Sequence, residues 1–265
     1  MQSIMQNGVA IPSDGKVGSG RWALVLDHDT HIVVEGGSRA EIIIADADAD
    51  VKLGVCVEPN ASLSVVHAVT KSGNSCIEYK LGEGASCRVT EVVLNSSELN
   101  IAARLDAPMA NFELDGAFIF TGEERGSVKV DVAHNVADCT SRTSFKGVAS
   151  GKAFGRFSGL VYVAPDAQRT SSEQSSRNVV IGDLAHIDTL PQLEIYADDV
   201  KCSHGATVGQ MDSDAVLYMR QRGLSLVDAK RLQIEGFVAN VAMHSSISDT
   251  AERLNELISA KLETL

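Results

Sequence analysis

The chain has 265 residues, of which 35 are acidic and 23 basic, and its formal net charge is -12. An acidic chain repels nucleic acid and anionic membranes unless its basic residues cluster, and the sequence contains no basic cluster. Aromatic residues make up only 5% of the chain, which contains 22 glycines and abundant Val, Ala, Ile and Leu. This composition is typical of many short strands joined by tight turns.

The cysteines and the apolar runs bear on where the protein works. Five cysteines without a CxxC pair do not suit a secreted disulfide framework. The longest purely aliphatic run, Ile42-Ile43-Ile44, is too short to span a bilayer, and the first residues lack the basic and apolar regions of a secretory signal. We therefore expect a cytoplasmic protein without a membrane or nucleic-acid partner.

Residues 1–20 are polar, Gly-rich and aperiodic, which predicts a loose N-terminal segment. From Trp22 onward apolar residues alternate with polar ones, for example from Val51 to Val57, as in half-buried strands. Turn signals recur about every 11 to 13 residues, a spacing shared by sandwiches, barrels and β-solenoids. From Trp22 to the helices, Asn-Gly and Asp-Gly hairpin dipeptides are absent except for Asp115-Gly116, so the turns resemble corners. We therefore predict a mainly β fold with a right-handed parallel β-helix core over residues 21–211.

The remaining residues, 212–265, are predicted to form a small α-helical domain of three helices. Apolar residues between Ala251 and Leu265 follow the helical rhythm and make one stripe, which we expect to pack on the β body. Gly223 suits the end of the first helix. Each helix is preceded by a capping signal: Asp212 or Ser213, Ser225 with Asp228, and Asp249 with Glu252.

The chain carries no catalytic signature. GxSxG, HExxH and GxGxxG motifs are absent, and residues 147–153 miss a phosphate-binding loop because the glycines are one residue too close. Asp46, Asp48 and Asp50 alternate on one strand face but lack the glycine of a calcium loop, which favours a solvated acidic surface. We expect a protein that is not an enzyme and binds no nucleotide directly.

Candidate metal-ligating residues gather between Pro191 and Gly209, at the junction of the strands and the helices. Cys202 and His204 lie two residues apart, so an extended backbone directs both side chains to one face, roughly 7 Å apart. Thiolate and imidazole are ligands that suit iron. The competing interpretation is that Cys202 is a core thiol and His204 a hydrogen-bonded corner residue, and the residues alone leave both open.

Several blocks of the second half resemble the SufB/SufD family of iron–sulfur cluster assembly proteins. The residues from Pro191 to Gly209 resemble the SufD signature, and those from Leu217 to Gly223 resemble a helix end shared by both members. The resemblance is specific from about residue 131 to 240, and upstream only the strand rhythm agrees. The further matching blocks are His134–Arg142, Phe145–Val148, Gly155–Gly159 and Ala167–Thr170.

The resemblance implies a scaffold subunit of a cytosolic SUF-type assembly complex, in a short form lacking an N-terminal helical domain. It implies pairing by edge strands with a SufB-like paralogue or a second copy of the chain, with a transient iron–sulfur cluster at the interface. His204 and Cys202 would be this chain's ligands, and the SufB-type cysteine position falls at or near Ser176. The C-terminal helices would dock a SufC-like ABC ATPase, through Tyr218, Arg220, Arg222, Gly223 and Phe237.

A second class of function remains for a β-helix, namely a structural or carbohydrate-binding protein without cluster chemistry. Asp198, Asp199 and Lys201 could supply the carboxylates and the cation of a sugar-binding groove. The low aromatic content argues against sugar stacking.

Overall fold

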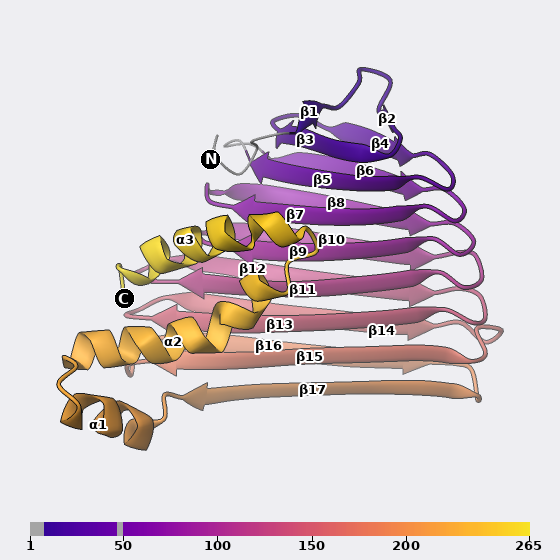
Figure 1. Ribbon diagram of the computed structural model, residues 1–265. Helices are drawn as coiled ribbons and strands as arrows, with labels where there is room; N and C mark the ends of the chain where they lie inside the picture. The colour runs from indigo at the N-terminus through magenta and orange to yellow at the C-terminus, as the bar shows by residue number, and fades with distance from the viewer. Residues whose placement is uncertain (1–7, 47–49) are drawn as a thin grey trace.

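The computed structural model describes residues 8–46 and 50–265. Seventeen strands in this part of the chain pair in parallel and form two sheets (Figure 1). Odd-numbered strands form a nine-stranded sheet in chain order, and even-numbered strands form an eight-stranded sheet facing it. Successive strands therefore belong to opposite sheets, so the chain winds as a parallel β-helix. The predicted fold class, a mainly β protein with a β-helix core and a small helical part, is confirmed.

The nine-stranded sheet consists of β1 (Val9–Ala10), β3 (Gly20–Leu26), β5 (Arg39–Asp46), β7 (Ser62–Val69), β9 (Ser86–Val93), β11 (Asn111–Phe120), β13 (Thr140–Ser150), β15 (Thr170–Ile181) and β17 (Val200–Gln210). The eight-stranded sheet consists of β2 (Lys16–Val17), β4 (Thr30–Val34), β6 (Val51–Val57), β8 (Gly73–Leu81), β10 (Ser97–Leu105), β12 (Arg125–His134), β14 (Phe154–Val163) and β16 (His186–Ile195).

The register shows that one coil of the β-helix contains two strands and two corners. Arg39 lies beside Ser62, and Thr140 lies beside Ser171, so a coil lengthens from 23 to 31 residues along the chain. The spacing of the predicted turns corresponds to about half a coil, because a corner follows each strand. Corners, rather than hairpin reversals, are what parallel pairing requires.

The core lies between the two sheets and is built from the inward-facing residues of each strand. Val65, Val89 and Leu114 share one register row and are all buried, so each coil stacks like residues on the coil before it. Each fully buried side chain of this size contributes about 1.5–3 kcal/mol. Aromatic rings pack against one another in the core of the middle and later coils, as the contacts Tyr79–Phe112, Phe118–Phe120 and Phe145–Phe157 show.

Three helices follow the strands: α1 (Ser213–Gln221), α2 (Leu226–Met243) and α3 (Ala251–Leu262). Helices α2 and α3 lie across the outer face of the nine-stranded sheet (Figure 1), where they bury a second apolar cluster. Leu254, Ile258 and Leu262 of α3 belong to that cluster, so the predicted stripe does pack on the β body. None of the helices in the described residues has the length and hydropathy needed to cross a membrane.

Two of the three predicted helix starts are confirmed by hydrogen bonds. The Asp212 carboxylate accepts from the backbone N–H groups of Asp214 and Ala215, and the Ser225 hydroxyl accepts from that of Asp228. The prediction for Asp249 is wrong, because its carboxylate is held by Arg21 across the sheet instead of by the helix. Asp249 thus takes part in a long-range ion pair and does not cap α3.

The structure departs from the sequence-based expectations at three further places. Short strands β1 and β2 lie inside the segment predicted to be loose, where the buried Val17 belongs to the core. Asp115-Gly116 lies inside β11, which pairs in parallel with β13, and not in a hairpin. The Asp115 carboxylate accepts a hydrogen bond from Arg142 of β13. Of the alternating acidic residues, Asp48 lies outside the described residues.

Candidate functional site

The candidate site lies at the C-terminal end of the β-helix, on its last coil. In the described part of the chain, β17 pairs only with β15, and β16 pairs only with β14. Both strands therefore leave one edge of backbone donors and acceptors without a neighbouring strand. Exposed strand edges of this kind are templates for pairing with another chain.

Cys202 and His204 both lie on β17, and the register directs them toward the interior of the coil. Cys202 lies beside Ser172 and His204 beside Gln174, and the two β15 residues are buried inside the β-helix. Because no further strand covers β17, His204 is exposed, although it faces inward. The shared face predicted for the two side chains is thus present, at the open end of the β-helix.

Cys202 differs from His204 in its surroundings. Its thiol is half-buried and packs against a small apolar cluster that includes Val161, Val163 and Ala197. Burial raises the pKa of the Cys202 thiol, and a hydrogen bond from the backbone of Ser172 partly offsets that effect. At neutral pH the thiol is therefore protonated, and it would have to lose a proton to bind a metal.

A polar lining distinguishes the last coils from the rest of the core. Inward-facing positions of β15 carry Ser172, Gln174, Ser176 and Asn178, each at most 3% exposed, where earlier coils carry Val, Leu and Phe. The Ser172 hydroxyl lies 2.8 Å from that of Ser141 on the coil above. Asn178 donates to the Ser176 hydroxyl and to the backbone carbonyl of Thr207, so the lining reaches the last strand.

Some buried polar groups of the last two strand pairs, on β15 and β16, have no hydrogen-bond partner among the described residues. They are the amide nitrogen of Gln174, the amide oxygen of Asn178 and the hydroxyl of Thr189 on β16. A buried polar group without a partner costs roughly 1–3 kcal/mol. Of these residues, Gln174 lies beside His204 in the register and Asn178 lies beside Val208, so the last coil contains unsatisfied polar groups along β15.

Cys202 and His204 do not form a complete metal site by themselves. Within the described residues, no three His, Cys, Asp or Glu side chains lie close enough together to hold a metal ion. Ser176, at the predicted SufB-type cysteine position, is fully buried and offers a hydroxyl in place of a thiol.

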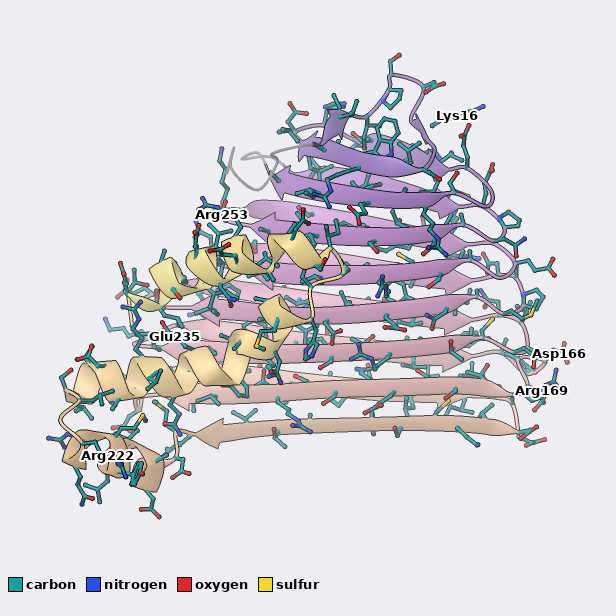
Figure 2. The ribbon with its side chains drawn as sticks, viewed as in Figure 1. Lys16, Asp166, Arg169, Arg222, Glu235 and Arg253 are labelled. Carbon is teal, nitrogen blue, oxygen red and sulfur yellow. The ribbon has the colours of Figure 1, made fainter. Side chains whose placement is uncertain are left out.

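The predicted docking residues on α1 lie together at the end of the molecule near β17. Tyr218 is 55% exposed, and the Arg222 guanidinium stacks 4.5 Å from the centre of its ring. Figure 2 shows Arg222 at this end, far from the corner that carries Arg169. Gly223 has a φ of +98°, which ends α1 in a conformation that favours glycine. Exposed apolar side chains extend this surface: Leu217, Leu226 and Val227.

Phe237 is separated from that surface. It lies on α2, is half-buried and packs against the outer face of the nine-stranded sheet. Lys146 of β13 donates to its backbone carbonyl and lies 5.1 Å from the centre of its ring. The structure thus brings Tyr218, Arg220, Arg222 and Gly223 together on α1 and its end, and it places Phe237 between α2 and the β body.

The polar lining is the part of the site that sequence reasoning missed. Residues 170–178 contain no apolar side chain at all, although both neighbours of this segment in the chain are strand-like. A polar stretch of this length has no apolar face to bury, so it indicates either an exposed segment or a polar interior. Only the coil stacking shows that these residues lie inside.

The comparison with protein families agrees with this geometry. Residues 19–237 match the family described as "SUF system FeS cluster assembly, SufBD core domain". That span includes every strand from β3 to β17, and it ends at Phe237 in α2.

Individual relatives carry the same description. The chain is 37% identical over 142 residues to iron–sulfur cluster assembly protein SufD of Escherichia coli, covering 54% of this chain and 34% of that protein. It is 42% identical over 105 residues to a SufBD family protein of Synechocystis, covering 40% and 23%. A SufBD family protein of Mycobacterium leprae is 26% identical over 262 residues, covering 92% and 62%.

These relatives are longer than the matched regions, since the chain spans only about a quarter to three fifths of their length. The family match nevertheless covers most of this chain, and the parallel β-helix is continuous through it. The chain therefore belongs to the SufBD core-domain family of the SUF iron–sulfur cluster assembly system, and it is similar to SufD.

Proposed function

We propose that this chain is a scaffold subunit in iron–sulfur cluster assembly, contributing His204 to a cluster site that a partner chain completes. The observation that carries the proposal is the position of His204, exposed on the inward face of an uncovered last strand. The partner would be a SufB-like paralogue or a second copy of this chain. The nascent cluster is then the cargo of the complex, and this chain performs no chemistry alone.

Pairing through β16 and β17 is supported by what these strands leave exposed. Leu190 and Ile195 on β16, and Val208 on β17, are 59%, 37% and 46% exposed. Apolar exposure beside unpaired strand edges is characteristic of interaction surfaces. A partner seated there would cover the open coil and place its own ligands opposite His204.

His204→Ala tests the ligand role. The complex with the SufB-like and SufC-like partners should lose most of its reconstituted iron and sulfide, because imidazole supplies a nitrogen ligand that alanine lacks. The fold should be unaffected, since His204 makes no hydrogen bond or ion pair with any described residue. Iron and sulfide assays on the reconstituted complex measure the effect, with His28→Ala, an exposed histidine between β3 and β4 and away from the last coil, as the matched control.

Cys202→Ala in the same assay separates the two interpretations of the thiol. Loss of cluster comparable to that of His204→Ala would make Cys202 a ligand. Full cluster loading, with a lower unfolding temperature, would make it a core thiol. Normal loading of His204→Ala would contradict the proposed site itself.

We also propose that α1 and the start of α2 dock the SufC-like ATPase. The exposed pair Tyr218–Arg222 with its apolar neighbours supplies an aromatic and guanidinium anchor, the residue types that dominate interface energetics. Placed beside the end of β17, such a dock would transmit ATP-driven movement to the cluster site.

Tyr218→Ala and Arg222→Ala should each weaken binding of the ATPase about tenfold or more. Calorimetric titration or pull-down with the purified ATPase measures this. Arg104→Ala, an exposed arginine on β10 of the opposite sheet, is the matched control. Unchanged affinity in both α1 variants would remove the dock from this surface.

A further inference from the structure

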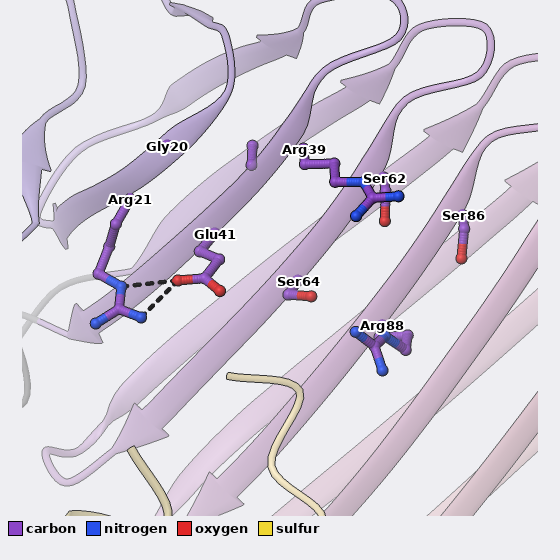
Figure 3. A pocket seen from close by; sticks show the side chains of 9 residues that line it. Gly20, Arg21, Arg39, Glu41, Ser62, Ser64, Ser86 and Arg88 are labelled. Atoms are coloured by element: carbon purple, nitrogen blue, oxygen red, sulfur yellow. Dashed lines mark hydrogen bonds and ion pairs between the residues drawn. The ribbon is translucent and has the colours of Figure 1, made fainter. Parts of the chain in front are cut away.

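A polar groove lies on the outer face of the nine-stranded sheet, near its N-terminal end and away from the last coil. It encloses about 890 Å³ over strands β3 to β9 (Figure 3). Arg39 and Arg88 line it together with the hydroxyl groups of Ser62, Ser64 and Ser86. Neither the cluster site nor the proposed dock uses any of these residues.

The strand register places Ser62 and Ser64 of β7 between the two strands that carry the arginines, and it places Ser86 on β9 with Arg88. Arg39, Ser62 and Ser86 form one row across β5, β7 and β9, and Ser64 and Arg88 belong to the next row on the same face. Strands β5 and β9 lie two strand spacings apart, roughly 10 Å, which two arginine side chains span when they lean toward each other. Figure 3 shows both side chains lying over this region with the three serines around them.

The charges in the groove are unequally satisfied. Arg21 is held by Glu41, at 2.6 Å, and by Asp249, at 2.6 Å, so this guanidinium and the carboxylate of Glu41 compensate each other. Arg39 and Arg88, in contrast, make no ion pair with the described residues. Two exposed guanidinium groups therefore line the same groove without an ion-pair partner among the described residues, and Glu41, the carboxylate that lines the groove with them, is engaged by Arg21.

The carboxylate nearest to Arg88 in the register is already engaged. Glu113 of β11 lies beside Arg88, but it accepts a hydrogen bond from Asn111 and lies 3.7 Å from Arg142. The hydroxyl groups are also available, since those of Ser62 and Ser64 make no hydrogen bond with the described residues. The Ser86 hydroxyl only accepts a long one, 3.4 Å, from Asn111.

The segment between α2 and α3 holds the edge of the groove in place. Ser246 donates from its backbone to the Thr90 hydroxyl at 2.8 Å and from its own hydroxyl to the backbone carbonyl of Val65 at 2.5 Å. Asp249 in turn fixes Arg21. Because the floor is a β-sheet and this edge is tied to it, the donors are preorganised, which lowers the entropic cost of binding.

We propose that this groove binds a phosphoryl group, with Arg39 and Arg88 as its cationic contacts and the serine hydroxyls as further donors. Guanidinium groups pair with phosphate oxygens in bidentate fashion, and hydroxyl groups satisfy the oxygens that remain. The donors come from three neighbouring strands of one sheet face, β5, β7 and β9, and they are numerous enough to meet more oxygens than the two of a carboxylate. The site does not depend on the proposed cluster site.

Titration of the full chain with inorganic phosphate and pyrophosphate, followed by calorimetry or phosphorus NMR at low ionic strength, tests the proposal. Both should bind, and Arg39→Gln and Arg88→Gln should each weaken binding about tenfold, with Ser64→Ala weakening it less. Arg104→Gln, which removes the same charge from the opposite sheet, should bind as the wild type does. Circular dichroism confirms that each variant is folded.

The outcomes that would overturn the proposal are defined by the same titrations. Absence of binding at millimolar phosphate would refute it, as would equal affinity of the double variant Arg39→Gln, Arg88→Gln and the wild type. Acetate or chloride competing as well as phosphate at matched ionic strength would show general electrostatic attraction and not a phosphoryl site. None of these measurements requires a cluster, so they are independent of the His204 experiments.

Discussion

At the scale of single residues, buried polar side chains carry most of what is unusual about this β-helix. His67 and Glu91 occupy inward positions in β7 and β9, lie beside each other in the register and are fully buried. The imidazole Nδ1 of His67 lies 3.0 Å from a carboxylate oxygen of Glu91. Strand alternation predicts that these positions face the core, but it also predicts apolar residues there.

His134 is a second buried histidine, and its surroundings set its charge. It is fully buried at the end of β12, and its Nε2 lies 2.8 Å from the Ser141 hydroxyl. Burial lowers the pKa of His134 to about 4, because the charged imidazolium loses its solvation. The side chain is therefore neutral in the folded protein at neutral pH. Through the Ser141 hydroxyl it is linked to Ser172 of the polar lining.

This shift predicts how stability depends on pH. Below pH 6.5 the unfolded chain binds a proton at His134 that the folded chain excludes, so stability falls as the pH drops toward 4. The full difference is about 3 kcal/mol. Urea unfolding between pH 7 and 4 should show a steeper loss for the wild type than for His134→Gln, which cannot titrate.

Protonation of ion-paired carboxylates also destabilises the folded protein in acid. The comparison of the two pH profiles separates the contribution of His134 from theirs. Asp188 and Asp249 have pKa values lowered by their arginine partners, and the wild type and His134→Gln both retain these pairs. Parallel curves for the wild type and His134→Gln would contradict the assignment.

At the scale of the strands, inward-facing glycines leave room in the core for large side chains of other strands. Gly116 of β11 lies beside Phe145 of β13, and a Cβ atom at Gly116 would meet the phenylalanine ring at 2.3 Å. Gly159 of β14 similarly leaves space for the amide of Gln174, which would meet an added Cβ at 2.0 Å. In both cases a glycine on one strand leaves room for a large side chain on the neighbouring or facing strand.

Gly116→Ala should therefore destabilise the protein by about 1–3 kcal/mol, because the ring of Phe145 must move out of its packed position. Thermal or urea unfolding measures the loss. Gly209→Ala on β17 is the matched control, since no atom lies within 4 Å of the position of its added Cβ. Equal stability of the two variants would show that the ring adapts without cost.

At the scale of the whole molecule, the helices cover part of the outer face of the nine-stranded sheet but do not cover the last coil of the β-helix. Helices α2 and α3 cover part of the outer face and leave the groove of Arg39 and Arg88 beside them. The last coil remains uncovered in the described residues, with β16 and β17 at its edges. Repeat architectures need their terminal units capped, so the uncovered coil is where the proposed partner would bind.

The same open coil explains how far the candidate site could be predicted. The spacing of Cys202 and His204 sufficed to place both side chains on one face, because strand alternation is a local property. Their unequal exposure could not be predicted, because it depends on β15 lying on one side of β17 and no strand lying on the other. The roles of Tyr218 and Arg222 likewise stay predictions, although their exposure on α1 agrees with them.

The sequence by itself determined the strand periodicity, the three C-terminal helices and the family resemblance, since period, capping residues and motif blocks are all read over short distances. The tertiary structure alone decided which positions meet across coils. Residues some 20 to 30 positions apart become neighbours through the coil length, which no local pattern encodes. For that reason the polar lining, the buried His67–Glu91 pair and the arginine groove became visible only in the folded chain.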